Sequence, residues 1–217
     1  MVAYPIPLLC FALQDLDLSS NNLKGTFPSE LVHLASLKTF RFAGAFGAFY
    51  GRRPFPTFLF NMSTLTEIDL AATGVEGTIP EMEHPSKLGG ELRHGSGRVL
   101  GGGDVNIMDV KVFTTREESY YIARTEINPL FANLLVLKLD SNHITGTLPT
   151  TIGLFTSLLT LSFPLNAITG SIPTEVGNMA ALQDMEFYDA KLSGTIPTEI
   201  GNLRNLVLCR LDNNMVD

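Results

Sequence analysis

The chain has 217 residues, a formal net charge of −7 and 17% charged residues. This length is ample for one hydrophobic core. The acidic balance, with no run of basic residues, argues against nucleic acid as the main partner. No stretch approaches the roughly 18 consecutive apolar residues of a membrane-spanning helix, so no span is predicted.

The chain opens with an apolar stretch, residues 1–13, which Pro5 and Pro7 interrupt. A signal peptide would begin with basic residues, and none precede this stretch. We therefore expect an apolar edge that packs on the segment after it. Cys10 and Cys209 lie near opposite ends of the chain and are expected to be reduced, buried thiols.

Few features of the sequence bear on the compartment, which it leaves unknown. Asn61-Met62-Ser63 is a lone glycosylation sequon, a triplet that is frequent by chance. With no paired cysteines and no basic leader, the cytoplasm is favoured over a secreted or membrane-associated location.

A phrase of about 24 residues then recurs along the chain. Its units open at Leu13, Leu37, Leu65, Leu134, Leu158, Leu182 and Leu206. Six units close on a proline, at Pro28, Pro56, Pro80, Pro149, Pro173 and Pro197. Apolar residues at fixed offsets with this period predict a solenoid, because one coil cannot bury its own apolar face and stacked coils can.

Each unit begins with a strand pattern. In the unit at Leu158, Leu161 and Phe163 alternate with Thr160, Ser162 and Pro164. Side chains of a strand alternate between its two faces, so the first pair should be buried and the other three more exposed.

An asparagine follows the strand in several units, where its amide can bond backbone groups as the chain leaves the sheet. The predicted structural ladder consists of Asn21, Asn142, Asn166 and Asn214. The second, third and sixth units carry Ala45, Thr73 and Ala190 at this position, so the ladder is incomplete.

This phrase resembles the plant-type leucine-rich repeat, L-x-x-L-x-L-x-x-N-x-L-x-G-x-I-P, over residues 13 to about 80 and 134–217. The resemblance implies an α/β solenoid with short parallel concave strands and a mostly irregular convex side that carries short helical turns. It also implies protein binding, because this class is similar to receptor-like kinase ectodomains and soluble inhibitor proteins of plants and algae.

Three parts are expected. Residues 1–80 hold the N-terminal edge and units one to three, 81–133 interrupt the repeats, and 134–217 hold units four to seven, the last one truncated at Asp217. In the third unit, Glu83 and Ser86 replace the closing apolar pair, so this coil should be open on one side.

The interruption is open to three readings. It is an inserted functional loop, two decayed repeats, or foreign sequence such as an unspliced intron read in frame. Gly89–Gly103 is glycine-rich, which is typical of a mobile loop. Arg124–Ile127 echoes Pro197–Ile200. We favour a flexible tract followed by a degenerate coil.

No catalytic, metal or cofactor motif emerges. The histidines at positions 33, 84, 94 and 143 share no metal-ligand spacing. Gly95–Leu100 lacks the last glycine of a dinucleotide loop and the lysine of a phosphate loop. We therefore predict a protein that is not an enzyme and needs no cofactor.

The candidate site is the concave face, formed by the outward strand positions of each unit. The predicted partner-binding residues are Asp15, Asp17, Arg41, Glu67, Asp69, Lys138, Asp140, Asp184, Glu186, Tyr188, Arg210 and Asp212. Acids dominate this face, so the expected partner is a basic protein or peptide. The alternatives are a solubility surface, a fragment of a receptor-like kinase ectodomain, or a truncated gene product without independent function.

Overall fold

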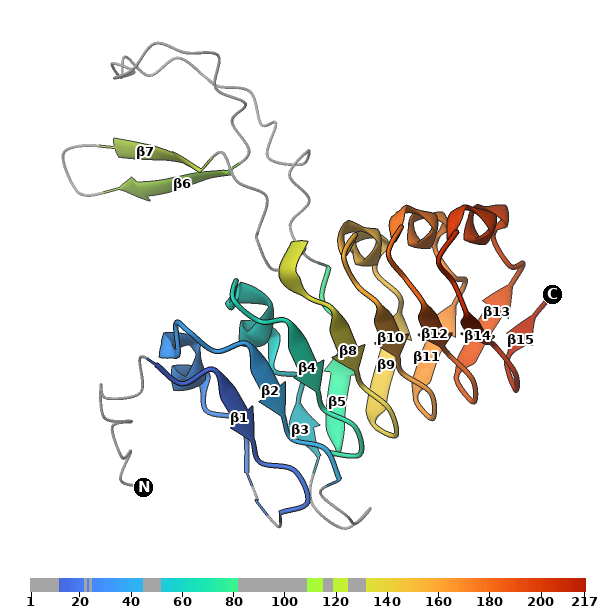
Figure 1. The fold of residues 1–217 in the computed structure, drawn as a ribbon, viewed down its shortest axis with the longest axis horizontal. Coiled ribbons are helices and arrows are strands. Elements are labelled where there is room, and N and C mark those ends of the chain that lie inside the picture. The colour runs from blue at the N-terminus through green and yellow to red at the C-terminus, as the bar shows by residue number, and fades with distance from the viewer. Residues whose placement is uncertain are drawn as a thin grey trace.

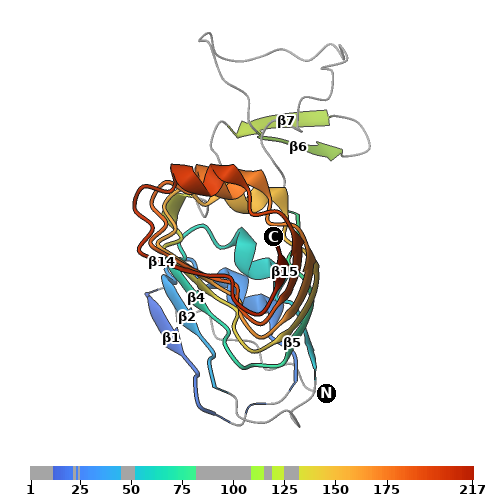
Figure 2. The ribbon, with the colours of Figure 1, turned by 90° about the vertical axis from the view of Figure 1, so that its right-hand side faces the viewer.

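The computed structural model describes residues 12–21, 23, 25–44, 52–81, 109–114, 119–124 and 132–217, with the side chains of 109–114 and 119–124 excepted. Coils stack along one axis with their strands side by side (Figure 1). Viewed along the stack, a sheet forms each of two sides, and short helical turns close the C-terminal coils (Figure 2). The expected α/β solenoid is confirmed.

The concave face belongs to a seven-stranded sheet in which every pair is parallel. Its strands are β1 (Asp15–Asp17), β2 (Thr39–Arg41), β4 (Glu67–Asp69), β8 (Val136–Lys138), β10 (Thr160–Ser162), β12 (Asp184–Glu186) and β14 (Leu208–Arg210). Equivalent positions of successive units pair in register, as Leu161 does with Met185. The repeat therefore sets the register directly.

A second sheet, also parallel, runs along the opposite side of the coils. Its strands are β3 (Arg53–Pro54), β5 (Val75–Thr78), β9 (His143–Thr147), β11 (Ala167–Gly170), β13 (Lys191–Gly194) and β15 (Met215–Val216). The expectation of a mostly irregular convex side missed this sheet. Its strands are very short. Gly170 and Gly194 end two of them with φ angles of 79° and 81°, which lie outside the β region of backbone conformation.

The 3-10 helices η1 (Ser29–His33), η2 (Thr57–Asn61), η4 (Thr150–Leu154), η5 (Thr174–Asn178) and η6 (Thr198–Asn202) each follow a closing proline. Proline suits a helix start because its missing N–H would have no partner there. These turns stack closely: a Cβ added at Gly153 would lie 2.2 Å from the Glu175 carbonyl oxygen.

The core runs unbroken through the stack. Leu161 and Phe163 are fully buried, which confirms the prediction for these two residues. The rings of Phe163 and Phe187 stack with their centres 3.9 Å apart. The prediction that Ser162 and Pro164 are more exposed was wrong. Ser162 is only 3% exposed, because its short side chain lies between the longer Lys138 and Glu186 on the neighbouring strands.

The ladder of the concave sheet closes across the interruption. Ile68 of β4 pairs directly with Leu137 of β8, and the Leu135 N–H donates to the Thr66 carbonyl. The described strands of the interruption, β6 (Asp109–Thr114) and β7 (Ser119–Arg124), instead pair antiparallel with each other. The expected degenerate coil is therefore not inserted between β4 and β8.

Several expectations fall outside the described residues: the apolar edge before residue 12, Cys10, the glycine-rich tract, Glu83 and Ser86. The three-part division of the chain stays a prediction. Cys209 is exposed rather than buried, because β14 lies at an edge of the sheet and has one neighbouring strand. Among the described residues, no helix is long and apolar enough to cross a membrane.

Candidate binding face on the seven-stranded sheet

The outward positions of the concave face form three rows across the strands. The first row is Asp15, Thr39, Glu67, Val136, Thr160, Asp184 and Leu208. The second row is Asp17, Arg41, Asp69, Lys138, Ser162, Glu186 and Arg210. The third, just past the strands, is Ser19, Ala43, Ala71, Asp140, Pro164, Tyr188 and Asp212. All twelve predicted site residues lie in these rows.

The second row alternates in charge over its first four strands: Asp17, Arg41, Asp69 and Lys138 follow one another. Strands lie about 4.8 Å apart, so each charge has an opposite neighbour. A sum of charges over the face does not reveal this order. The N-terminal half of the face is therefore less acidic locally than its composition suggests.

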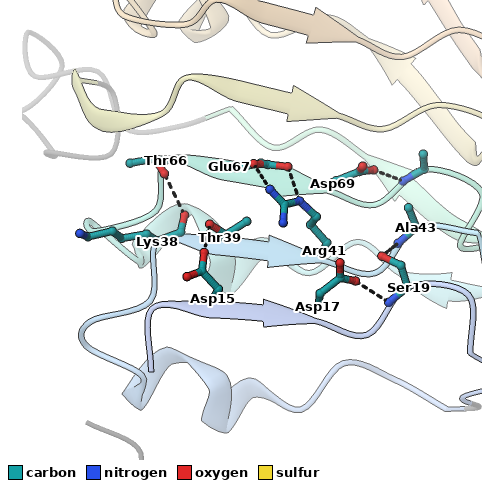
Figure 3. Close-up of polar contacts among 11 residues, drawn as sticks. Asp15, Asp17, Ser19, Lys38, Thr39, Arg41, Ala43, Thr66, Glu67 and Asp69 are labelled. Carbon is teal, nitrogen blue, oxygen red and sulfur yellow. Dashed lines mark hydrogen bonds and ion pairs between the residues drawn. The ribbon is translucent and has the colours of Figure 1, made fainter. Parts of the chain in front are cut away.

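Arg41 makes the strongest ion pair of this half (Figure 3). Its Nε and Nη2 atoms each donate to a Glu67 carboxylate oxygen at 2.6 Å, a bidentate geometry. The hydrogen bond to Glu67 raises the pKa of Arg41. Beside it, the Thr39 hydroxyl donates to Asp15 at 2.6 Å. The Arg41 guanidinium and the Glu67 and Asp15 carboxylates therefore already have partners within the face.

Asp17 and Asp69 hold the chain as it leaves their strands (Figure 3). The Ser19 N–H donates to Asp17 Oδ1 at 2.9 Å, and the Ala71 N–H donates to Asp69 Oδ1 at 3.0 Å. Hydrogen bonding from Ser19 lowers the pKa of Asp17. Each carboxylate keeps a second oxygen for other contacts.

Asp140 lies at the centre of the face, where the carboxylates crowd together. Burial raises the pKa of Asp140, and the nearby Asp69 and Glu186 carboxylates raise it further. The Ser162 hydroxyl, which donates to Asp140 at 2.5 Å, and the charge of Lys138 act in the opposite direction without cancelling the rise. The carboxylate of Asp140 is therefore harder to ionise than an exposed aspartate.

Arg210 organises the C-terminal end of the face. It lies 3.7 Å from a Glu186 oxygen and 3.5 Å from Asp212, and its guanidinium is 3.8 Å from the centre of the Tyr188 ring. This distance is typical of a cation–π contact. Tyr188, one of the predicted partner-binding residues, is therefore covered in part by Arg210. Asp184 accepts a 3.4 Å hydrogen bond from the Thr160 hydroxyl.

The asparagine ladder is confirmed as structural. Asn166 is 8% exposed; its Nδ2 donates to the Leu139 and Phe163 carbonyls, and its Oδ1 accepts from the Ile144 N–H. Each inner asparagine thus ties its own turn to the preceding coil. Asn142 and Asn214 bond backbone carbonyls in the same way, whereas Asn21 in the first unit bonds only the Leu18 and Ser19 carbonyls of its own turn.

The two described departures from the ladder are compensated by neighbours. The Thr73 hydroxyl donates to the Leu70 carbonyl, the contact that an asparagine would make, and the Thr73 N–H donates to Asn142 Oδ1. Ala190 has no polar side chain, but Asn214 of the next coil reaches back to the Phe187 carbonyl and the Leu192 N–H. The sequence alone does not show this help from the following coil.

The rest of the described surface offers no metal site: within the described ranges, no group of three or more His, Cys, Asp or Glu side chains could hold an ion. His33 Nδ1 lies 3.0 Å from the Glu30 carbonyl, and His143 is exposed on the second sheet. His84 and His94 lie outside the described residues.

The sequence profile of the Leucine Rich Repeat family matches residues 12–34 and 133–155. A search of curated proteins finds no significant match.

Solved structures are similar over nearly the whole chain. One is the LRR ectodomain of the Arabidopsis thaliana membrane receptor kinase GASSHO1/SCHENGEN3 with CASPARIAN STRIP INTEGRITY FACTOR 2 (25% identity, TM-score 0.65, 94% of this chain and 19% of that one). Another is the plant peptide hormone receptor RGFR1 with RGF2 (22%, 0.60, 95% and 24%). A third is the Arabidopsis receptor kinase HAESA with the peptide hormone IDA and the co-receptor SERK1 (23%, 0.61, 92% and 26%).

The chain thus spans about a fifth to a quarter of the length of these receptor chains. The profile matches fall on the first and fourth units of the repeat. The repeated phrase, the parallel sheets and these likenesses together show the leucine-rich repeat fold and support a repeat of the plant type.

Proposed function

We propose that the concave face binds a basic protein or peptide without catalysis. The observation that carries this proposal is the excess of acids over bases among the predicted site residues, eight to three. At the partly buried Asp140, burial and repulsion from the nearby Asp69 and Glu186 carboxylates raise the pKa. A cationic side chain seated there would relieve this repulsion and keep Asp140 ionised.

The receptors that resemble this chain support the choice of ligand class. One is a plant peptide hormone receptor in complex with RGF2, another is in complex with the peptide hormone IDA, and the third is in complex with CASPARIAN STRIP INTEGRITY FACTOR 2. Their sequences are 22–25% identical to this chain, and it covers a small part of each. Peptide binding by this chain is therefore our inference from the shared fold together with its own acidic centre.

A second candidate is that the chain is part of a receptor ectodomain, as the same likenesses favour. Such a placement is outside the cytoplasm, which is opposite to the compartment expected from the sequence. The two placements differ in what they predict for the sequon at Asn61, so they can be separated by experiment.

The proposal is tested by selecting peptides from a random display library against the full chain. We expect the enriched peptides to be rich in Lys and Arg, because only cations gain from the crowded carboxylates. Binding of a selected peptide should weaken in the Asp69→Asn and Asp140→Asn double variant. Enrichment of neutral or acidic peptides, or equal binding by that variant, would refute the proposal.

A further inference from the structure

The sequon Asn61-Met62-Ser63 lies at the end of η2, away from the concave face. Asn61 is the last residue of η2 and is exposed, whereas Met62 is 4% exposed and part of the core. Because Met62 points inward, Asn61 on one side of it remains at the surface, and Ser63 on the other side is half-buried. The side chain that would carry a glycan is thus accessible in the folded chain.

Among the described residues, the Asn61 side-chain amide makes no hydrogen bond. The backbone around it is held independently. The Met62 N–H donates to the Leu59 carbonyl, and the Ser63 carbonyl accepts from Asn133 Nδ2 at 2.9 Å. A substituent on the Asn61 amide would therefore disturb no described contact.

The repeat supplies an internal comparison. Asn178 ends η5 and Asn202 ends η6, as Asn61 ends η2, and both are exposed. Two residues further on, these units carry Ala180 and Arg204 rather than a hydroxyl residue. An asparagine at this place is thus ordinary for the repeat, and Ser63 is what makes one of the three a sequon.

We propose that Asn61 is N-glycosylated, an inference that rests on the receptor-like placement proposed above. The donor class is an oligosaccharide carried on a polyisoprenyl diphosphate. The Asn61 amide nitrogen forms a bond to the anomeric carbon of the sugar, the bond from that carbon to the diphosphate breaks, and the proton lost by the amide neutralises the leaving diphosphate. No electrons are exchanged with a further reactant.

A glycan at this position suits a binding role for the concave face. It would extend from the helical turns, which lie on a different side of the coil from the strands (Figure 2). N-linked glycans are bulky and solubilising, so this placement would shield the helical side and leave the concave sheet open.

The test uses the full chain purified from its native cell. Intact mass is measured before and after peptide-N-glycosidase treatment, and peptide mapping identifies any asparagine converted to aspartate. We expect a loss of mass equal to one oligosaccharide, with the conversion at position 61. Asn61→Gln and Ser63→Ala should each abolish the shift, and neither should change the unfolding midpoint of the deglycosylated chain appreciably.

The matched control is Ala180→Thr, which creates an Asn-Met-Thr sequon at the equivalent place in the fifth unit. Glycosylation of Asn178 in this variant without glycosylation of Asn61 would overturn the proposal. The chain would then be a substrate of the oligosaccharide transferase, and the enzyme would leave Asn61 unmodified. Modification at neither position would overturn it as well, since the chain then never meets the transferase. Peptide binding by Asn61→Gln should equal that of the parent, so a failure here is distinct from a failure of the concave site.

Discussion

The fifth and seventh coils carry the same phrase but differ in how deeply it is buried. In the fifth, Leu161 is fully buried and Asn166 is 8% exposed. In the seventh, the equivalent Cys209 is exposed and Asn214 is partly exposed. The fifth coil has paired strands on both sides, whereas β14 pairs with β12 alone. Burial in this fold is therefore supplied by the neighbouring coils and not by the coil's own sequence.

The largest difference in stability between these two coils is expected for a charge placed in the core, as in Leu161→Asp. An unpaired carboxylate would be buried between two coils, so the free energy of unfolding should fall by about 4 kcal/mol. Urea unfolding followed by circular dichroism measures the loss. The control is Cys209→Asp, which should cost less than about 1 kcal/mol because the position faces solvent. Equal losses at the two positions would mean that the coils do not bury each other as described.

A second test concerns the stacking of the helical turns. Gly153→Ala should cost about 3 kcal/mol, because the added methyl would meet the Glu175 carbonyl oxygen of the next coil. Gly201, the equivalent in η6, has no atom within 4 Å of an added Cβ. Gly201→Ala should be neutral or slightly stabilising by restricting the unfolded chain. Thermal unfolding of both variants gives the comparison, and a neutral Gly153→Ala would contradict the close stacking.

The asparagine ladder gives a third, smaller contrast. Asn166→Ala should cost about 2 kcal/mol, because it leaves the Leu139 carbonyl and the Ile144 N–H without their partner in a buried place. Asn21 makes related bonds at an exposed position, so water can replace them. Asn21→Ala should therefore cost well under half as much, as measured by urea unfolding. A larger loss of unfolding free energy for Asn21→Ala than for Asn166→Ala would contradict the expectation that burial sets the contribution of each asparagine.

The smallest effect is expected in the pH dependence of stability. Because the folded-state pKa of Asp140 is raised, the folded chain binds a proton more readily than the unfolded chain. The contribution of Asp140 to stability is thus present at low pH and is lost as pH rises from the unfolded value, about 3.9, through the raised one. The difference in unfolding free energy between parent and Asp140→Asn should change in that window. A constant difference across it would contradict the raised pKa.

Much of this architecture could be predicted from the sequence, because a repeat reports both its strand and its register. The alternation within each strand predicts the burial of Leu161 and Phe163, and the fixed offsets of the repeat predict where the ladder asparagines lie. Ser162 was misjudged because its burial depends on the length of its neighbours, Lys138 and Glu186. The second sheet was missed because its short, glycine-ended strands have no apolar alternation.

Other features depend on contacts between distant segments. The direct pairing of β4 with β8 across the interruption cannot be read from local sequence, since it depends on which strands find each other in space. Glu81 is another case: its carboxylate accepts from the Thr151 hydroxyl at 2.8 Å and from the Thr150 N–H at 3.3 Å. Burial by itself would raise the pKa of Glu81, but these hydrogen bonds lower it.

The charges of the concave face were predicted as a set but not as an arrangement. The repeat alignment places Asp17, Arg41 and Asp69 at equivalent offsets, so their alternation was available as a signal. The crowding around Asp140 was not, because it depends on how far each side chain is withdrawn from solvent. The binding role of these residues remains our proposal.

The most direct measurement of that proposal is the association rate of a selected basic peptide as a function of salt, in two variants of equal net charge. Asp184→Asn with Glu186→Gln removes two charges from the concave face. Glu175→Gln with Glu199→Gln removes two from the helical turns. We predict that the first pair slows association several-fold at low salt and flattens its salt dependence, while the second leaves both near the parent values. Equal behaviour of the two pairs would contradict the account, because net charge rather than the concave face would then govern binding.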